Sequence, residues 1–418
     1  MLFAKNINLK NLSYYLLSSV ITSIIGLLIN PFLSVGLSHD DFAIIGYFAS
    51  FSSVLTPVIT FCFSNYYARN YFLIEEEERR KLLNTILSLF IIFGFIILIL
   101  FYLGYYYYHI NFIPSIPFTP YAFLSFLPLY FISFYNIYLL DLRMKNESKE
   151  YFFITVFNAL FSGLLSVLLV YVLRYGAVGR LVAILIVTVF FGVYVLKAKK
   201  FSFNIDWSRV KEMILFCTPL TISAILTFFF MGIDRTFLAK LNNNHNLGLY
   251  NIGLQISGYL GIFGTVFLQT FEPDLYKYAS LRQNKKVGYL LALITIMTLL
   301  PNLLFIILSK PLISILTYGK YVEASGYASV LCIRNVTTSL SFSLSSVLVG
   351  YGFSKYELFN KIIGSFAAIL LYKYLIDNFG FYGAAWGQSI SWMIMGMISV
   401  IFLFSMRKKL KDYNKAEL

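Results

Sequence analysis

The sequence has little charge and few cysteines. Only 12% of its 418 residues are charged, and the chain has three cysteines. Cys62, Cys217 and Cys332 lie far apart, and all three fall within apolar segments. We therefore expect buried thiols rather than a disulfide framework or a cysteine metal site.

Common enzyme signatures are missing as well. The sequence contains no HExxH, no GxSxG on a strand-turn-helix pattern and no Walker loop. Three histidines occur, His39, His109 and His245, and all fall in predicted outer loops, where we expect them to be solvated. We predict no catalytic residue, no metal and no cofactor, and expect a protein that is not an enzyme.

Apolar residues dominate what remains. Hydrophobic residues make up 59% of the chain, and the mean hydropathy is +0.76. A membrane-spanning helix needs about 20 apolar residues, and alternating barrel strands are not visible. We predict an all-α membrane protein with twelve spans, near residues 12–36, 42–64, 82–105, 119–140, 152–173, 179–196, 213–238, 249–271, 288–309, 326–350, 358–376 and 383–405.

Basic residues are distributed unevenly over the predicted loops. The chain has 33 Lys+Arg against 19 Asp+Glu, for a formal net charge of +14. If the N-terminus lies inside, most of the 33 basic residues fall on the inner side. The positive-inside rule then places both termini in the cytoplasm of a multi-pass protein. Anionic lipid accounts for this charge, so we expect the bilayer and not a nucleic acid as the partner.

The chain also contains an internal repeat. Three well-separated matches have offsets that agree to within one residue of 205: Phe32 with Phe237, Ser148 with Ser354, and Gly176 with Gly380. The offset predicts two six-helix bundles, residues 1–200 and 201–418. Because six is even, both halves enter the membrane from the same side. They form a parallel repeat, and transporters often place substrates between such halves.

Several motifs follow this pattern in order. They are "LSHDDFAIIGYF" from Leu37, "SNYYARNYF" from Ser64, "GAVGR" from Gly176, "GIDRTFL" from Gly232 and "FEPDLYK" from Phe271. With twelve predicted helices, they resemble the polysaccharide flippases (the Wzx type, which moves O-antigen units) of the multidrug/oligosaccharidyl-lipid/polysaccharide exporter superfamily. The resemblance covers nearly the whole chain. It implies bundles in a V around a central cavity and transport by alternating access.

The resemblance also implies a cargo and partners. The cargo would be an undecaprenyl-pyrophosphate-linked oligosaccharide, moved from the inner to the outer leaflet of the bacterial cytoplasmic membrane for O-antigen or capsule assembly. A counter-transported proton or sodium ion and a polysaccharide polymerase are further candidate partners.

Charged residues inside the apolar segments are the candidate substrate-binding residues. Asp234 and Arg235 interrupt the segment 213–238, and Arg334 lies in 326–350. An arginine offers a planar fork that matches phosphate oxygens, and Asn30 offers uncharged hydrogen bonds in the first half. Arg235 lies about 36 Å beyond Lys211 along a straight helix. The alternative is therefore an interfacial arginine that extends toward water beside its aspartate.

Three other functions remain open. A cation-coupled multidrug exporter of the same superfamily tends to have a carboxylate in its first helix, whereas residues 14–37 carry no charge. The peptidoglycan-precursor flippases usually have fourteen helices. A membrane polysaccharide polymerase or ligase tends to have a large outer loop, and the predicted outer loops here are short.

Overall fold

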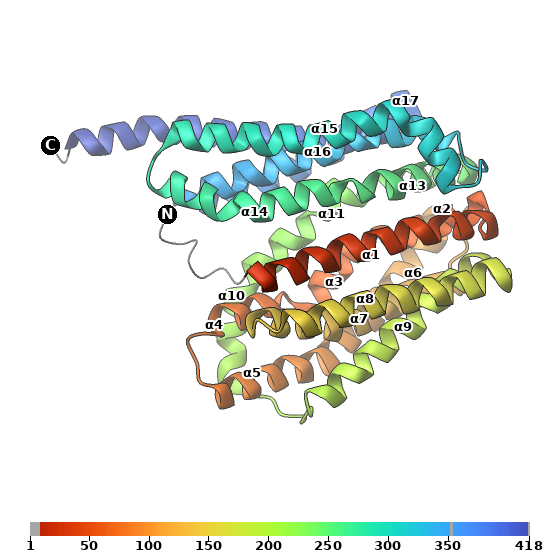
Figure 1. Ribbon diagram of the computed structural model, residues 1–418, viewed down its shortest axis with the longest axis horizontal. Helices are drawn as coiled ribbons and strands as arrows, with labels where there is room; N and C mark the ends of the chain where they lie inside the picture. Colours follow the sequence, from red (N-terminus) through yellow and green to blue (C-terminus); the bar gives the residue numbers. More distant parts are fainter. Residues whose placement is uncertain (1–8, 352–353, 417–418) are drawn as a thin grey trace. The chain divides into compact units, whose positions relative to one another are not determined.

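Helices form nearly all of the computed structural model, which describes residues 9–351 and 354–416. Those residues contain no β-strand, so the predicted all-α class is confirmed. The chain divides into two compact units (Figure 1). Unit 1 comprises Met1–Ile225 with Leu316–Lys320, and unit 2 comprises Leu226–Ile315 with Tyr321–Leu418.

Unit 1 is built around the packing of long apolar helices. Tyr135, Val187 and Phe191 are buried together where α7 meets α9. Helix α1 packs along α8, where Gly163 admits the Ile29 side chain. The α-helices of this unit are α1 (Leu9–Gly36), α2 (His39–Ser50), α3 (Ser52–Thr60), α4 (Phe63–Asn70), α5 (Glu76–Leu89), α6 (Phe95–Phe112), α7 (Tyr121–Met144), α8 (Ser148–Ser166), α9 (Gly176–Ala198) and most of α10 (Trp207–Leu226). Two π-helical segments, η1 (Phe90–Gly94) and η2 (Val167–Val172), continue α5 and α8.

Unit 2 has its own apolar core. Leu275, Ile294 and Val347 are buried together at the contact of three helices, α14, α15 and α16. The helices of this unit are α11 (Phe228–Met231), α12 (Ile233–Ala239), α13 (Asn244–Tyr259), α14 (Gly261–Ser280), α15 (Asn284–Leu316), α16 (Ala324–Gly350) and α17 (Ser354–Ala416). The last residue of α15, Leu316, belongs to unit 1.

Ten helical stretches among the described residues are long and apolar enough to cross a membrane, so the chain is a multi-pass membrane protein. Two segments account for the difference between these ten stretches and the twelve spans predicted from the sequence. Helix α16 contains many serines and Arg334, which lower its mean hydropathy. Helix α17 is one apolar stretch in that count, although its backbone leaves the helical conformation at Gly380, where φ is 55° and ψ is −131°.

Glycine permits that break in α17. A positive φ costs glycine little because it has no Cβ. Gly176, its partner in the sequence repeat, also has a positive φ of 53° and is the first residue of α9. Beyond the break, a Cβ on Gly383 would lie 1.9 Å from the Leu375 carbonyl oxygen. The two arms of α17 therefore pack more closely than a side chain at Gly383 would allow.

Several of the predicted spans are not continuous α-helices. Residues 42–64 contain most of α2, all of α3 and the start of α4. Phe61 and Cys62, between α3 and α4, are left-handed, with φ of 45° and 49°. Residues 213–238 contain parts of α10 and α12 and all of α11, with a break at Gly232. Because the chain bends there, a straight-helix estimate of the depth of Arg235 does not apply.

Polar caps fix the ends of several helices. Ser38 caps α2 in a capping box with Asp41, and the Asp41 Oδ1 atom accepts the backbone N–H of Ala177 at 2.8 Å. Asn243, which lies 205 positions after Ser38, caps α13 by accepting the N–H of Asn246 at 3.0 Å. These side chains satisfy N–H groups that a helix leaves without partners. The family-like "LSHDDF" and "GAVGR" motifs thus form one structural contact.

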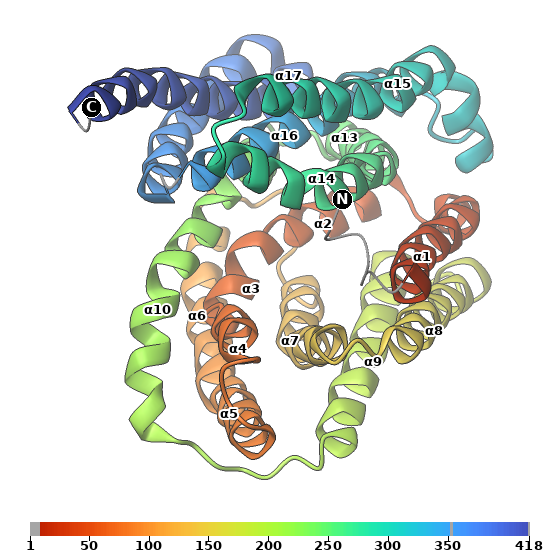
Figure 2. The ribbon, with the colours of Figure 1, turned by 60° about the vertical axis from the view of Figure 1, so that its left-hand side comes forward.

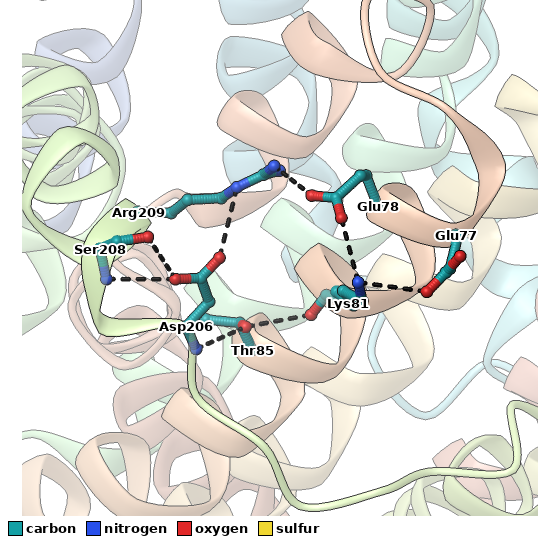
Figure 3. A network of polar contacts seen from close by, with 7 residues as sticks. All are labelled: Glu77, Glu78, Lys81, Thr85, Asp206, Ser208 and Arg209. Carbon is teal, nitrogen blue, oxygen red and sulfur yellow. Dashed lines mark hydrogen bonds and ion pairs between the residues drawn. The ribbon is translucent and has the colours of Figure 1, made fainter.

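The connection from α9 to α10 runs along α5 (Figure 2). The Asp206 backbone N–H donates to Thr85 Oγ1 at 3.1 Å, and Asp206 Oδ1 accepts from the Ser208 backbone and hydroxyl. Those hydrogen bonds lower the pKa of the Asp206 carboxyl. Arg209 then bonds both Asp206 and Glu78 of α5 (Figure 3). The network anchors the connection and the start of α10 to unit 1.

Candidate functional site

The carboxylate of Asp234 is the centre of a buried polar cluster in unit 2. Asp234 lies in α12 and is not exposed to solvent. Its Oδ2 atom accepts hydrogen bonds from Tyr250 Oη of α13 at 2.5 Å and from Gln388 Nε2 of α17 at 2.8 Å. A buried carboxylate is costly unless it is paired and hydrogen-bonded. These contacts therefore stabilise the charge and join three helices.

Arg235 follows on the same short helix. Only 9% of this residue is exposed, and its Nε atom lies 3.7 Å from Asp234 Oδ1. Its guanidinium also donates to the carbonyl oxygen of Met231, the last residue of α11. The break at Gly232 ends the helical bonding of α11, so that carbonyl needs a donor. Arg235 thus caps α11 and pairs with Asp234.

Arg334 reaches the same cluster from α16. Its guanidinium donates to Gln388 Oε1 at 3.1 Å, so Gln388 bridges Arg334 and Asp234. Arg334 also interacts electrostatically with Asp234 and Arg235. Two guanidinium groups and one carboxylate give the cluster a formal charge of +1.

A groove of about 600 Å³ adjoins this cluster within unit 2. The groove lies along α14 and α16, and Arg334 is part of its wall. The other polar residues of the wall include Gln269, Glu272, Asn335, Thr338 and Ser339. The wall therefore combines one cation, Arg334, and one carboxylate, Glu272, with amides and hydroxyls. The guanidinium has the geometry to bind an anionic group, and the amides and hydroxyls suit a polar, uncharged molecule.

Asn335 is held in place by a second hydrogen-bond network. Its Nδ2 atom donates to the Ser257 carbonyl oxygen at 2.9 Å and to Asn302 Oδ1 at 3.0 Å. Asn302 donates in turn to the Thr298 carbonyl oxygen at 2.8 Å. Satisfied buried amides fix side-chain positions, so the groove wall around Asn335 is rigid.

Three of the four predicted site residues come together, and one does not. Asp234, Arg235 and Arg334 belong to the cluster in unit 2, whereas Asn30 belongs to unit 1. Asn30 is 2% exposed, and its amide donates to the Leu316 carbonyl oxygen at 2.9 Å. That contact anchors the segment Leu316–Lys320.

Sequence reasoning missed Gln388 and Tyr250, which complete the cluster. Gln388 is the one glutamine in the apolar segment 383–405, which was a usable signal. Tyr250 gave no such signal, because the sequence contains 33 tyrosines and interfacial rings are common in membrane proteins.

Comparison with known proteins assigns the chain to a family. Residues 8–278 match the family described as "Polysaccharide biosynthesis protein". The chain belongs to this polysaccharide biosynthesis family. The resemblance seen in the sequence motifs is thereby confirmed, and the match covers all of "LSHDDFAIIGYF", "GIDRTFL" and "FEPDLYK". No curated protein matches the chain.

Solved structures share the fold of this family member. A structure titled "Lipid II flippase MurJ, inward closed conformation" aligns with a TM-score of 0.70 at 16% identity, over 94% of this chain and 87% of that one. An inward-facing "multidrug resistance MATE family transporter of the MOP superfamily" aligns with a TM-score of 0.69 at 14% identity, over 94% and 96%. The chain therefore has the fold of the exporter superfamily that its sequence resembles.

Proposed function

We propose that the chain is a flippase for an undecaprenyl-pyrophosphate-linked oligosaccharide, which it moves from the inner to the outer leaflet of a bacterial cytoplasmic membrane. The product would be used for a surface polysaccharide such as O-antigen or capsule. Two six-helix bundles, residues 1–200 and 201–418, would alternate access to the cargo, with both termini in the cytoplasm. A polymerase would use the translocated unit, and a proton or sodium ion would be counter-transported.

One observation carries the proposal: Arg334 forms part of a groove wall whose other polar groups are mostly uncharged. A lipid-linked oligosaccharide has the matching chemistry, since its pyrophosphate is anionic and its sugars are neutral and rich in hydroxyls. The guanidinium fork would bind phosphate oxygens, while the amides and hydroxyls would bind sugar. Gln388 holds Arg334 from the side of the cluster, so its position is set before cargo arrives.

The bilayer explains why this charge is buried. Charged groups within a membrane are costly and are usually found where a polar pathway needs them. Asp234 and Gln388 lower that cost in the absence of cargo, and they leave the cluster with a formal charge of +1. Arg235 and Arg334 would then both contribute to the attraction of a pyrophosphate.

Reconstituted vesicles test this function. The full chain would be placed in proteoliposomes that contain a fluorescent pyrophosphate-linked oligosaccharide lipid, and a membrane-impermeant quencher would report its transfer between leaflets. We expect the wild-type chain to accelerate transfer, and Arg334→Ala to slow it about tenfold, as loss of a charged hydrogen bond predicts. Lys285→Ala, an exposed cation of unit 2 outside the groove, is the matched control.

A cation-coupled drug exporter is the second candidate, because the groove also contains a carboxylate. Glu272 Oε1 accepts from Ser346 Oγ at 2.9 Å and from Tyr276 Oη at 3.1 Å. Transport of organic cations that Glu272→Gln abolishes, without any transfer of the lipid-linked oligosaccharide, would replace the flippase proposal with this one.

A further inference from the structure

A separate polar pocket of about 660 Å³ lies in unit 1. It is formed where the start of α5 meets the C-terminal ends of α7 and α9, and we name it the basic pocket. Five basic and three acidic residues line it: Arg79, Arg80, Lys145, Lys199 and Lys200, with Glu76, Asp141 and Glu147. Its formal charge is therefore +2.

Two of these cations, Lys145 and Lys199, form ion pairs within the protein. Asp141 is 1% exposed, and its Oδ2 atom lies 2.5 Å from Lys199 Nζ and 3.2 Å from Lys145 Nζ. Its Oδ1 atom accepts from Tyr67 Oη at 2.6 Å. Burial acts to lower the pKa of Lys145, but the charge and hydrogen bond of Asp141 outweigh it and raise that pKa. Asp141 is thus saturated, and it holds two lysines at helix C-termini, where cations are favourable.

Arg79 is partly engaged as well. Its guanidinium donates to the Tyr71 carbonyl oxygen at 3.1 Å and lies 4.7 Å from the centre of the Tyr71 ring. Arg80 and Lys200 differ: within the described part of the chain, neither side chain makes a hydrogen bond or ion pair. The pocket therefore presents two cations without protein partners, on a wall that Asp141 and the tyrosines keep in place.

We propose that the basic pocket binds a phosphate oxyanion, supplied by the headgroup of an anionic membrane phospholipid or by free inorganic phosphate. Arg80 and Lys200 would contact the oxyanion, and the neighbouring Asn84 amide would donate to it. The pocket volume favours a headgroup, since a bare phosphate occupies a small part of 660 Å³. Basic pockets between helices at the membrane surface are suited to such headgroups.

The position of the pocket fits this ligand. Helix α7 ends at Met144 and α9 at Ala198, and both are candidate spans, so the pocket lies where the chain leaves the apolar layer. The charge bias of the loops assigns this end of unit 1 to the inner leaflet. Glu76 and Glu147 are exposed at the pocket, and their negative charges repel an anionic ligand. An anion should therefore bind only if it also contacts Arg80 and Lys200.

Native mass spectrometry of the full chain in a neutral detergent tests the proposal with three probes. They are a short-chain phosphatidylglycerol, a short-chain phosphatidylcholine and inorganic phosphate. We expect one saturable phosphatidylglycerol site, bound at least about tenfold more tightly than phosphatidylcholine. The double variant Arg80→Gln with Lys200→Gln should weaken it about tenfold. Saturable binding of inorganic phosphate with the same sensitivity would identify free phosphate as the ligand.

Two further variants make the result decisive. Lys197→Gln removes an exposed cation near the pocket but outside its lining, and should leave binding unchanged. Glu147→Gln removes an opposing charge and should tighten binding severalfold, even if the double variant does not fold. Unchanged phosphatidylglycerol binding in the double variant, or no tightening in Glu147→Gln, overturns the proposal. This assay involves no translocated cargo, so its outcome is independent of the proposed flippase activity.

Discussion

The Asp41 carboxylate joins the starts of two helices that are separated by more than a hundred residues. Its Oδ1 atom accepts the N–H of Ala177 at the start of α9, at 2.8 Å, while Oδ2 accepts the N–H of Ser38 before α2, also at 2.8 Å. Gly176, which precedes Ala177, has a positive φ, and a Cβ there would lie 3.0 Å from Asp41 Oδ1. The carboxylate and the glycine therefore form one joint within unit 1.

Asp41→Ala should destabilise this joint. The substitution leaves N–H groups at two helix starts without their acceptor, which costs about 1–2 kcal/mol for one cap. We expect a lower thermal midpoint of the purified chain in detergent. Asp40→Ala is the matched control, because the neighbouring carboxylate is exposed and takes no part in the capping box. Equal midpoints for the two variants would contradict the role given to Asp41.

A second prediction concerns Gln388, which bridges Asp234 and Arg334. Gln388→Met keeps the length of the side chain but removes both hydrogen bonds, and it leaves two buried charges less well satisfied. The free energy of unfolding should fall by about 2–3 kcal/mol, since hydrogen bonds to charged groups contribute more than those between neutral groups. The measurement is the thermal midpoint together with the amount of chain in the membrane.

The control for Gln388 lies on the same helix. Asn378→Leu removes an exposed amide of α17 that donates only within the helix, to the Tyr374 carbonyl oxygen. It should change the free energy of unfolding by less than about 0.5 kcal/mol, and so hardly move the midpoint. If Gln388→Met is as mild as this control, the bridge does not stabilise the cluster.

The sequence was sufficient for the class of the fold, because membrane helices leave long apolar segments. It also located Asp234 and Arg235, since charge in such a segment is conspicuous. It could not reveal contacts made by distant residues. His109, for example, is predicted to be solvated, yet it is 2% exposed, because residues after α6 fold back and Ile116 accepts its Nε2–H at 2.7 Å.

Lys320 should stabilise the end of α1. Its ammonium donates to the carbonyl oxygens of Ser34, Val35 and Leu37, which a helix end leaves without donors. Lys320→Met should lower the free energy of unfolding by about 0.5–2 kcal/mol, within the range for a cation at a helix C-terminus. Lys310→Met, at an exposed lysine of α15, is the control.

The contribution of Lys320 should also depend on pH. Burial lowers the pKa of Lys320 from 10.5, and Arg174 acts in the same direction, whereas Asp41 opposes them. The unfolded chain then holds this proton more tightly than the folded chain, so folding stability should rise as pH increases from the lowered pKa toward 10.5. Lys320→Met should remove that rise. A midpoint that climbs equally in both proteins would assign the pH dependence to other groups.

The membrane orientation makes a separate prediction. The excess of basic residues on one set of loops predicts that both termini lie in the cytoplasm. An alkaline phosphatase reporter fused after Leu418 should be inactive, and the same reporter inserted in the loop 113–118 should be active. The second fusion verifies that the enzyme can fold when it is exported. Activity of the C-terminal fusion would rule out an even number of spans with an inner N-terminus.

Arg235→Ala separates a role in cargo binding from a role in the fold. If Arg235 helps to attract the proposed cargo, surface polysaccharide display should fall about tenfold while the chain still inserts in the membrane, because a charge-assisted interaction with phosphate would be lost. Arg235→Lys should recover part of the display, since an ammonium keeps the charge but lacks the planar fork. Lys240→Ala, an exposed cation just after α12, should have no effect.

Loss of inserted protein in Arg235→Ala but not in Arg235→Lys would show that the residue acts by capping α11 through Met231. Wild-type display in Arg235→Ala would remove Arg235 from the cargo pathway and leave Arg334 as the phosphate-binding cation of unit 2.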